Sequence, residues 1–136
     1  MRGLPLLIQL AQRATDEQCS ELGRVAAERE AAEAALTSHA AGMEREMEVA
    51  AGDPVAMMAL ASWRTHAVRV RTGLAQHEAE TARREDDARD ALRSAFVDLK
   101  RLEMAKDAAA RAARIAAMRR ADLRAEEQAG ALRTAG

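Results

Sequence analysis

The residues of this chain best suited to metal chemistry are three histidines and a single cysteine. His66 and His77 are eleven residues apart, so on a helix they share nearly one face but stand roughly 16 Å apart along the axis. That separation is too large for one metal ion, which needs several ligands at one point. His39 could approach them from another segment, but no cysteine or close pair of carboxylates completes a site. We therefore expect histidines at the edge of a helix seam, with no metal and no cofactor.

The sequence also contains no motif for nucleophilic catalysis or for phosphate binding. There is no P-loop and no glycine-rich phosphate cradle, and Ser and Thr residues are few. Cys19 is alone, so it forms no intrachain disulfide, and it fits a reducing compartment. The apolar run after Met1 is too short for the hydrophobic region of a signal peptide, so we expect none, and no apolar stretch is long enough to cross a membrane. These observations predict a non-enzymatic, cytoplasmic protein.

The composition indicates long helices rather than a thick core. Of 136 residues only 1% are aromatic, whereas 32% are charged, and Ala, Arg, Glu and Leu dominate. Aromatic side chains normally supply much of the buried area of a globular core. A sequence rich in Ala, Glu, Leu and Arg with a helical period is typical of coiled coils.

The segment Ala51-Gly52-Asp53-Pro54 is the one strong internal break. Gly52 is expected to take the left-handed conformation that ends a helix. Asp53 is suited to cap the next helix, and Pro54 to its first turn. The sequence thus predicts a single all-α domain, residues 1–136, with one helix at about 4–50, a turn at 51–54 and a second helix at about 54–132.

Apolar or small residues recur at steps of three and four along both predicted helices, which is the pattern of a coiled-coil seam. Because the turn is short, the helices should pack antiparallel, with Leu36 near Val70, Val25 near Thr81, and Leu4 near Leu102. Thr81 and Arg84 are expected to interrupt the seam, and Glu85-Asp86-Asp87 to form a solvated face. The predicted seam comprises Leu4, Ile8, Ala11, Leu22, Val25, Ala32, Leu36, Met43 and Met47 in the first helix and, in the second, Leu60, Trp63, Ala67, Val70, Leu74, His77, Ala88, Ala91, Ala95, Leu99 and Leu102.

The second helix is longer than the first, so it should extend beyond its partner from about Met104. The net charge is only −1, but Met104 to Arg124 holds six basic and two acidic residues, against three basic and ten acidic from Thr15 to Asp53. The basic stretch lacks the aromatic residues that stack on single-stranded nucleic acid. Its Ala-rich apolar face offers little area for membrane insertion. We therefore expect a protein partner, with neither nucleic-acid binding nor direct membrane insertion.

Four segments of the second helix carry a family resemblance. They are Ser62-Trp63, Leu74-Ala75-Gln76-His77, Ala91-Leu92-Arg93-Ser94 and Leu99-Lys100-Arg101-Leu102-Glu103. In their order and approximate spacing they resemble the flagellar FliJ family, whose coiled-coil hairpins also turn in the first half of the chain. Ala and Val stand after Ser94, where relatives often carry aromatic residues, and the basic tail here is short.

The resemblance implies a component of the flagellar type III export apparatus, peripherally associated with the membrane. It implies that the end bearing both chain termini enters a hexameric export ATPase as a central stalk. The half near the turn is associated with the membrane export gate, and export chaperones are further partners. Carried over to this chain, the gate-facing residues would be His66, Val70, Gly73 and His77. The same residues could instead line the seam between the helices.

The residues expected to contact the ATPase combine the arginines of the second helix with apolar residues near both termini. They are Leu4, Leu7, Arg111, Arg114, Ile115, Met118, Arg119 and Arg120. Two alternatives stay open: an export chaperone or holdase whose hairpin tip clasps client proteins, and a purely structural coiled coil that self-assembles. The tip from Ala50 to Val55 is expected to offer little apolar area, which disfavours the chaperone.

Overall fold

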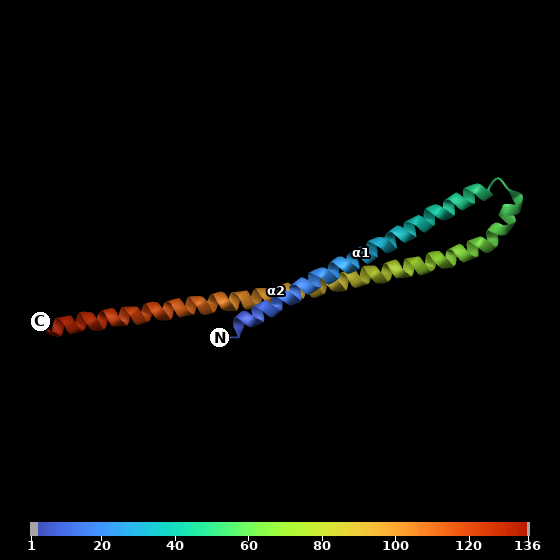
Figure 1. Ribbon diagram of the computed structural model, residues 1–136. Helices are drawn as coiled ribbons and strands as arrows, with labels where there is room; N and C mark the ends of the chain where they lie inside the picture. Colours follow the sequence, from blue (N-terminus) through green and yellow to red (C-terminus); the bar gives the residue numbers. More distant parts are fainter. Residues whose placement is uncertain (1–2, 136) are drawn as a thin grey trace. The chain divides into compact units, whose positions relative to one another are not determined.

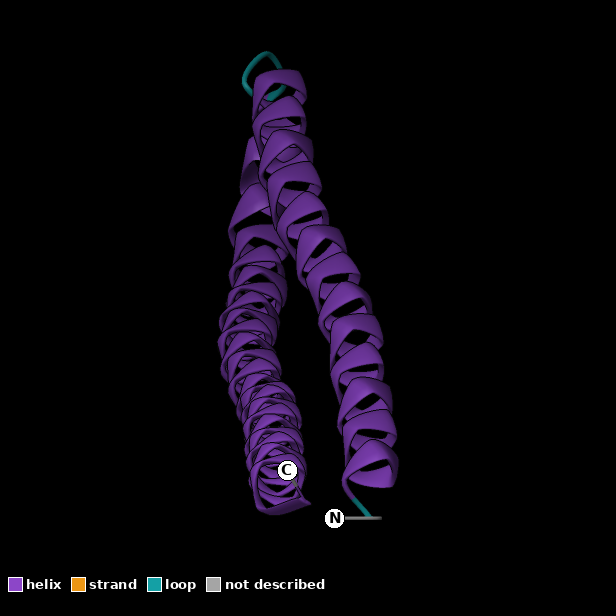
Figure 2. Ribbon diagram, turned by 90° about the vertical axis from the view of Figure 1, so that its left-hand side faces the viewer, coloured by secondary structure: helices purple, strands orange, loops and turns teal. Residues whose placement is uncertain are grey.

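The computed structural model describes residues 3–135, which form two α-helices joined by one turn (Figure 1). Helix α1 spans Leu4–Ala50 and helix α2 spans Pro54–Ala135. The helices pack against each other as an antiparallel hairpin. Figure 2, a view nearly along the helices, shows the turn at the top. The predicted all-α hairpin is therefore confirmed, and α2 continues three residues beyond its predicted end.

The turn confirms the predicted cap but not the predicted glycine conformation. The Asp53 carboxylate accepts a hydrogen bond from the Val55 N–H at 3.0 Å, and Pro54 is the first residue of α2. The left-handed conformation expected at Gly52 is wrong, because no glycine among residues 3–135 has a positive φ. Instead, the Asp53 N–H donates to the Ala50 carbonyl at 3.1 Å, which closes the turn without a left-handed residue.

Contacts group the described residues into two units, which we treat separately. One contains residues 15–95, with the turn and the helical segments on either side of it. Its seam is made largely of small side chains, since Ala32, Ala50, Ala67 and Ala88 are buried and Val25 is only 2% exposed. Small residues let two helix backbones approach closely, so a thin seam suffices to hold them together.

Polar residues belong to this seam, contrary to the sequence-based expectation. Thr81, expected to interrupt it, has no exposed surface, and its hydroxyl donates to the Glu78 carbonyl at 2.8 Å. Glu85, expected on a solvated face, is 5% exposed, whereas Asp86 and Asp87 are exposed as expected. The buried hydroxyl is satisfied by its own helix and therefore costs little in a desolvated seam.

Ion pairs across the seam indicate the register of the two helices. Arg84 donates to Glu28 at 2.9 Å, and Arg29 lies 3.2 Å from Glu85. Long side chains lean toward the N-terminus of their own helix. In an antiparallel pair, two residues that form an ion pair therefore each lie a few residues C-terminal to the backbone positions that face each other. Both ion pairs thus support the predicted proximity of Val25 and Thr81, the two most fully buried side chains.

The other unit contains residues 3–14 of α1 and α2 from Phe96 onward. Leu4 and Ile8 are buried in it, and Leu99, Leu102 and Ala109 are half-buried. From residue 110 to residue 135 every position is exposed except Gly130. The unpaired part of α2 therefore begins near residue 110, about six residues later than the sequence predicted.

Candidate protein-interaction surfaces

The four residues assigned by resemblance to the export gate form one exposed strip of α2, which we call the gate strip (His66, Val70, Gly73 and His77). All four are exposed, Val70 at 38%. Their spacing of four, three and four residues places them along one side of the helix. None of the four is buried in the seam, although His66 and Val70 border it beside residues of α1.

The seam of α2 runs beside this strip. Ala67 is buried, and Leu74 and Glu78 are half-buried. The predicted seam included His77, but Glu78 takes that place: it is half-buried, and its carboxylate lies 3.9 Å from Arg29 of α1. His77, one residue earlier, is exposed.

A shallow depression adjoins the gate strip within the unit of residues 15–95. Its lining from α2 is Trp63, His66, Ala67 and Val70, and its lining from α1 is His39, Gly42, Met43 and Glu46. Nδ1 of His39 is buried and has no hydrogen-bond partner among residues 3–135. Two members of the gate strip, His66 and Val70, therefore border a hollow to which both helices contribute.

The histidines do not assemble a metal centre. His39 and His66 line the same depression, but residues 3–135 contain no group of three or more His, Cys, Asp or Glu side chains that could hold a metal ion. Cys19 is exposed.

The residues assigned to the ATPase lie on the exposed part of α2, apart from the two leucines. We call this set the basic surface (Arg111, Arg114, Ile115, Met118, Arg119 and Arg120). Ile115 is 50% exposed and Met118 66%. None of the four arginines of the basic surface forms an ion pair with the described part of the chain. The residues that do form ion pairs all lie between Glu21 and Arg93.

The leucines of α1 require a correction. Leu4 was expected to contact a partner, but it is buried in its own unit, because it begins the apolar stripe that packs on α2. Leu7 is 50% exposed, and sequence reasoning missed its neighbours Leu6 and Leu10, at 59% and 50%. The signal was available: residues 3–12 carry no charge, so apolar side chains surround α1 there instead of following one stripe.

The region of the turn also differs from expectation. Val49 is 77% exposed, Val55 75% and Met58 84%. The expectation of little apolar area covered Ala50 to Val55, and exposed Val55 contradicts it within that segment, while Val49 and Met58 add apolar area beside it. The tip therefore offers apolar surface.

Comparison of the chain with protein-family models, with curated proteins and with solved structures found no match in any of the three. Within residues 3–135, neither helix has a stretch apolar enough to cross a membrane.

Proposed function

We propose that this chain is a non-enzymatic component of the flagellar type III protein export apparatus, acting in the cytoplasm at the membrane. It binds the hexameric export ATPase as a central stalk and couples it to the export gate. Two observations support the proposal: the family resemblance of α2 and the helical hairpin fold. The observation that carries it is the basic surface, whose arginines have no ion-pair partner among the described residues and flank exposed Ile115 and Met118.

Physical chemistry favours an acidic protein partner for the basic surface. Guanidinium groups pair with carboxylates through two parallel hydrogen bonds, and unpaired arginines remain available for this. Exposed apolar side chains beside them are typical of interaction sites. Leu7, together with Leu6 and Leu10, adds apolar area from α1, and the buried Leu4 supports that helix end without contacting the partner.

The test is a titration of the full chain against purified hexameric export ATPase. The double variant Arg114→Glu and Arg120→Glu should weaken binding by about tenfold or more at low salt, chiefly by slowing association. Arg64→Glu with Arg69→Glu makes the same change in net charge at exposed positions of the other unit and should leave ATPase binding unchanged. Thermal unfolding followed by helicity should be unaffected in both variants, since all four residues are exposed.

Two results would contradict this assignment. If both double variants weaken binding equally, the interaction depends on net charge and not on the basic surface. If Arg114→Glu with Arg120→Glu leaves binding intact, the ATPase contacts another part of the chain. Stimulation of ATP hydrolysis by the parent chain, absent with the double variant, would support the role of a stalk.

The gate strip can be tested against the cytoplasmic domain of the export gate protein. Val70→Asp should abolish binding, because a carboxylate at a 38% exposed apolar position would be desolvated at an interface. Ala91→Asp, on α2 outside the strip and also exposed, is the matched control. Equal binding by Val70→Asp and the parent would remove the strip from the proposal.

One observation favours a second candidate function, that of an export chaperone or holdase. Exposed Val49, Val55 and Met58 near the turn are suited to contact an unfolded client. The chain should then suppress aggregation of an unfolded export substrate, and the triple change of these residues to Ser should remove that activity while ATPase binding remains. No suppression by the parent chain would exclude this candidate.

A further inference from the structure

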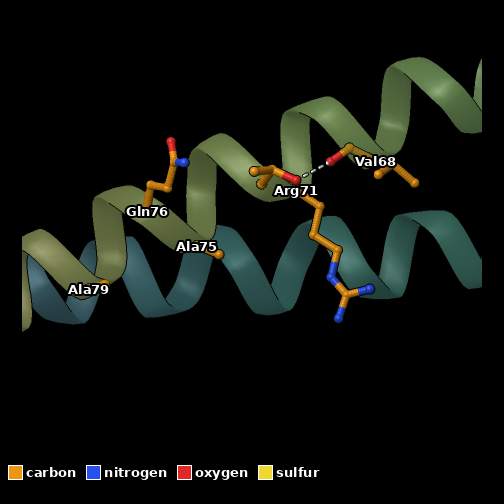
Figure 3. A pocket seen from close by; sticks show the side chains of 6 residues that line it. Val68, Arg71, Ala75, Gln76 and Ala79 are labelled. Carbon is orange, nitrogen blue, oxygen red and sulfur yellow. Dashed lines mark hydrogen bonds between the residues drawn. The ribbon is translucent and has the colours of Figure 1, made fainter.

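A shallow groove runs along α2 near the turn, and the gate strip does not include it. Figure 3 shows its part from Val68 to Ala79, with α1 passing behind α2. Two adjoining depressions share Val68, and every residue that lines them belongs to α2. The floor consists of Ala61, Thr65, Val68, Thr72, Ala75 and Ala79.

The floor residues follow the spacing of a second coiled-coil seam. Their steps are four, three, four, three and four residues, which is the period by which one helix presents a continuous stripe to another. At 100° per residue the stripe is turned by about 120–160° around the helix axis from Ala67 and Thr81, which face α1. The intramolecular partner therefore leaves this stripe uncovered.

The groove can be covered at little cost to hydrogen bonding. Thr65 donates its hydroxyl hydrogen bond to the Ala61 carbonyl at 3.1 Å, and Thr72 donates to the Val68 carbonyl at 2.9 Å. Both hydroxyls are thus satisfied within α2, so a partner that desolvates them leaves no hydroxyl unpaired. Small side chains at the other positions admit close approach of a helix backbone. Val68, 49% exposed, supplies the largest apolar contact.

The charges along the groove select the partner. Arg64, Arg69 and Arg71 border it, all three are exposed, and none forms an ion pair with another described residue. No aspartate or glutamate occurs between Pro54 and His77, and Glu78 and Glu80 flank only the last floor residue, Ala79. In coiled coils the residues that flank the seam set partner choice through charge pairing. The complement of this groove is therefore a helix with small or apolar seam residues flanked by carboxylates.

We infer that this groove is the docking site for an acidic amphipathic helix of another protein, which packs on α2 as a third helix. The inference is independent of the proposed export function, since it uses neither the basic surface nor the gate strip. A membrane surface fits less well, because alanine and threonine bury little apolar area in a bilayer interface.

The probe is a labelled synthetic helix of about four heptads, with Ala and Leu in its seam and Glu at both flanking positions. Its matched control carries Gln in place of Glu. Fluorescence anisotropy with the full chain should show the Glu peptide binding about tenfold or more tightly than the Gln peptide, with affinity falling as salt rises. The double variant Val68→Glu with Ala75→Glu should lose this binding.

Ala91→Glu with Val97→Glu introduces the same charges at exposed positions of α2 outside the groove and should leave binding intact. Equal affinity for both peptides, or binding unaffected by Val68→Glu with Ala75→Glu, would overturn the inference. The inference would also be overturned if the parent chain self-associates in analytical ultracentrifugation and Val68→Glu with Ala75→Glu abolishes that self-association, since a second copy would then occupy the groove. Groove-dependent binding to anionic lipid vesicles in place of the Glu peptide would also overturn it.

Discussion

Arg29 of α1 lies 3.2 Å from the carboxylate of Glu85 of α2, and that glutamate side chain is only 7% exposed. Arg89 pairs with the other carboxylate oxygen at 2.6 Å, so both oxygens of the buried group have a cation. The hydrogen bond to Glu85 is the main cause that raises the pKa of Arg29 above its ordinary value. This pairing joins the two helices at one register, because a slip along the seam would leave a buried carboxylate without Arg29.

Removal of Arg29 should therefore destabilise the hairpin. We expect Arg29→Met to lower the free energy of unfolding by about 1–3 kcal/mol, since it leaves a buried carboxylate with Arg89 alone. The double variant Arg29→Met with Glu85→Leu should recover most of the loss, because it removes the buried charge as well. Urea unfolding followed by helicity measures both.

The matched control is Arg93→Met, which removes an exposed pair with Asp90 whose side chains are 75% and 71% exposed. Such pairs contribute roughly 0–1 kcal/mol, so this variant should unfold almost as the parent does. Similar losses in the free energy of unfolding for Arg29→Met and Arg93→Met would show that the buried pair with Glu85 contributes no more than an exposed pair.

The two helices were predictable because their signals are local. Asp53 and Pro54 start α2 independently of distant residues. The spacing of three and four residues around Val25 likewise depends only on the residues of one helix. The burial of Thr81 and Glu85 was not predictable in this way. A stripe read from one helix treats a polar residue as an interruption, whereas Glu85 is buried because Arg29 arrives from the other helix.

The candidate surfaces show the same division. The exposure of Arg114 and Ile115 followed from the difference in length between the helices. Steps of three and four fit His77 and Glu78 equally well, so the sequence did not decide between them, whereas the structure places Glu78 3.9 Å from Arg29 of the facing helix. The groove along Val68 was missed because its threonines look polar in sequence, and only their bonds to backbone carbonyls show that they can be covered.

Gly52→Ala distinguishes the observed turn from the one expected from sequence. Gly52 has no positive φ, and an added Cβ would meet no atom within 4 Å. The variant should raise the free energy of unfolding by roughly 0.4–1 kcal/mol, because alanine restricts the unfolded chain. A loss of about 1 kcal/mol or more would instead indicate a left-handed residue. As a reference in the same turn, Asp53→Ala should cost about 1 kcal/mol by removing the cap of α2.

His39 is a position where a polar group weakens the seam. Its Nδ1 is buried without a hydrogen-bond partner in the described part of the chain, next to Trp63 and Val70 in the depression shared by both helices. An unsatisfied buried polar group costs about 1–3 kcal/mol, so His39→Leu should raise the melting temperature. His66→Leu and His77→Leu, at exposed positions, should change it little. A lower melting temperature for His39→Leu would show that the imidazole is satisfied in solution.

The carboxyl of Glu21 should make a small part of the stability depend on pH. The Arg24 guanidinium donates hydrogen bonds to it and holds the pKa of Glu21 below its ordinary value. A carboxyl with a lowered folded-state pKa stabilises the fold above its unfolded pKa of about 4.3, and this contribution disappears as the pH falls through the folded value. Arg24→Gln should therefore lower the melting temperature at neutral pH and approach the parent in acid, whereas Arg13→Gln, which removes an arginine without a described ion pair, should show no such convergence. If the difference in melting temperature between Arg24→Gln and the parent is the same at neutral and acid pH, it comes from the helix propensity of residue 24 and not from the pairing with Glu21.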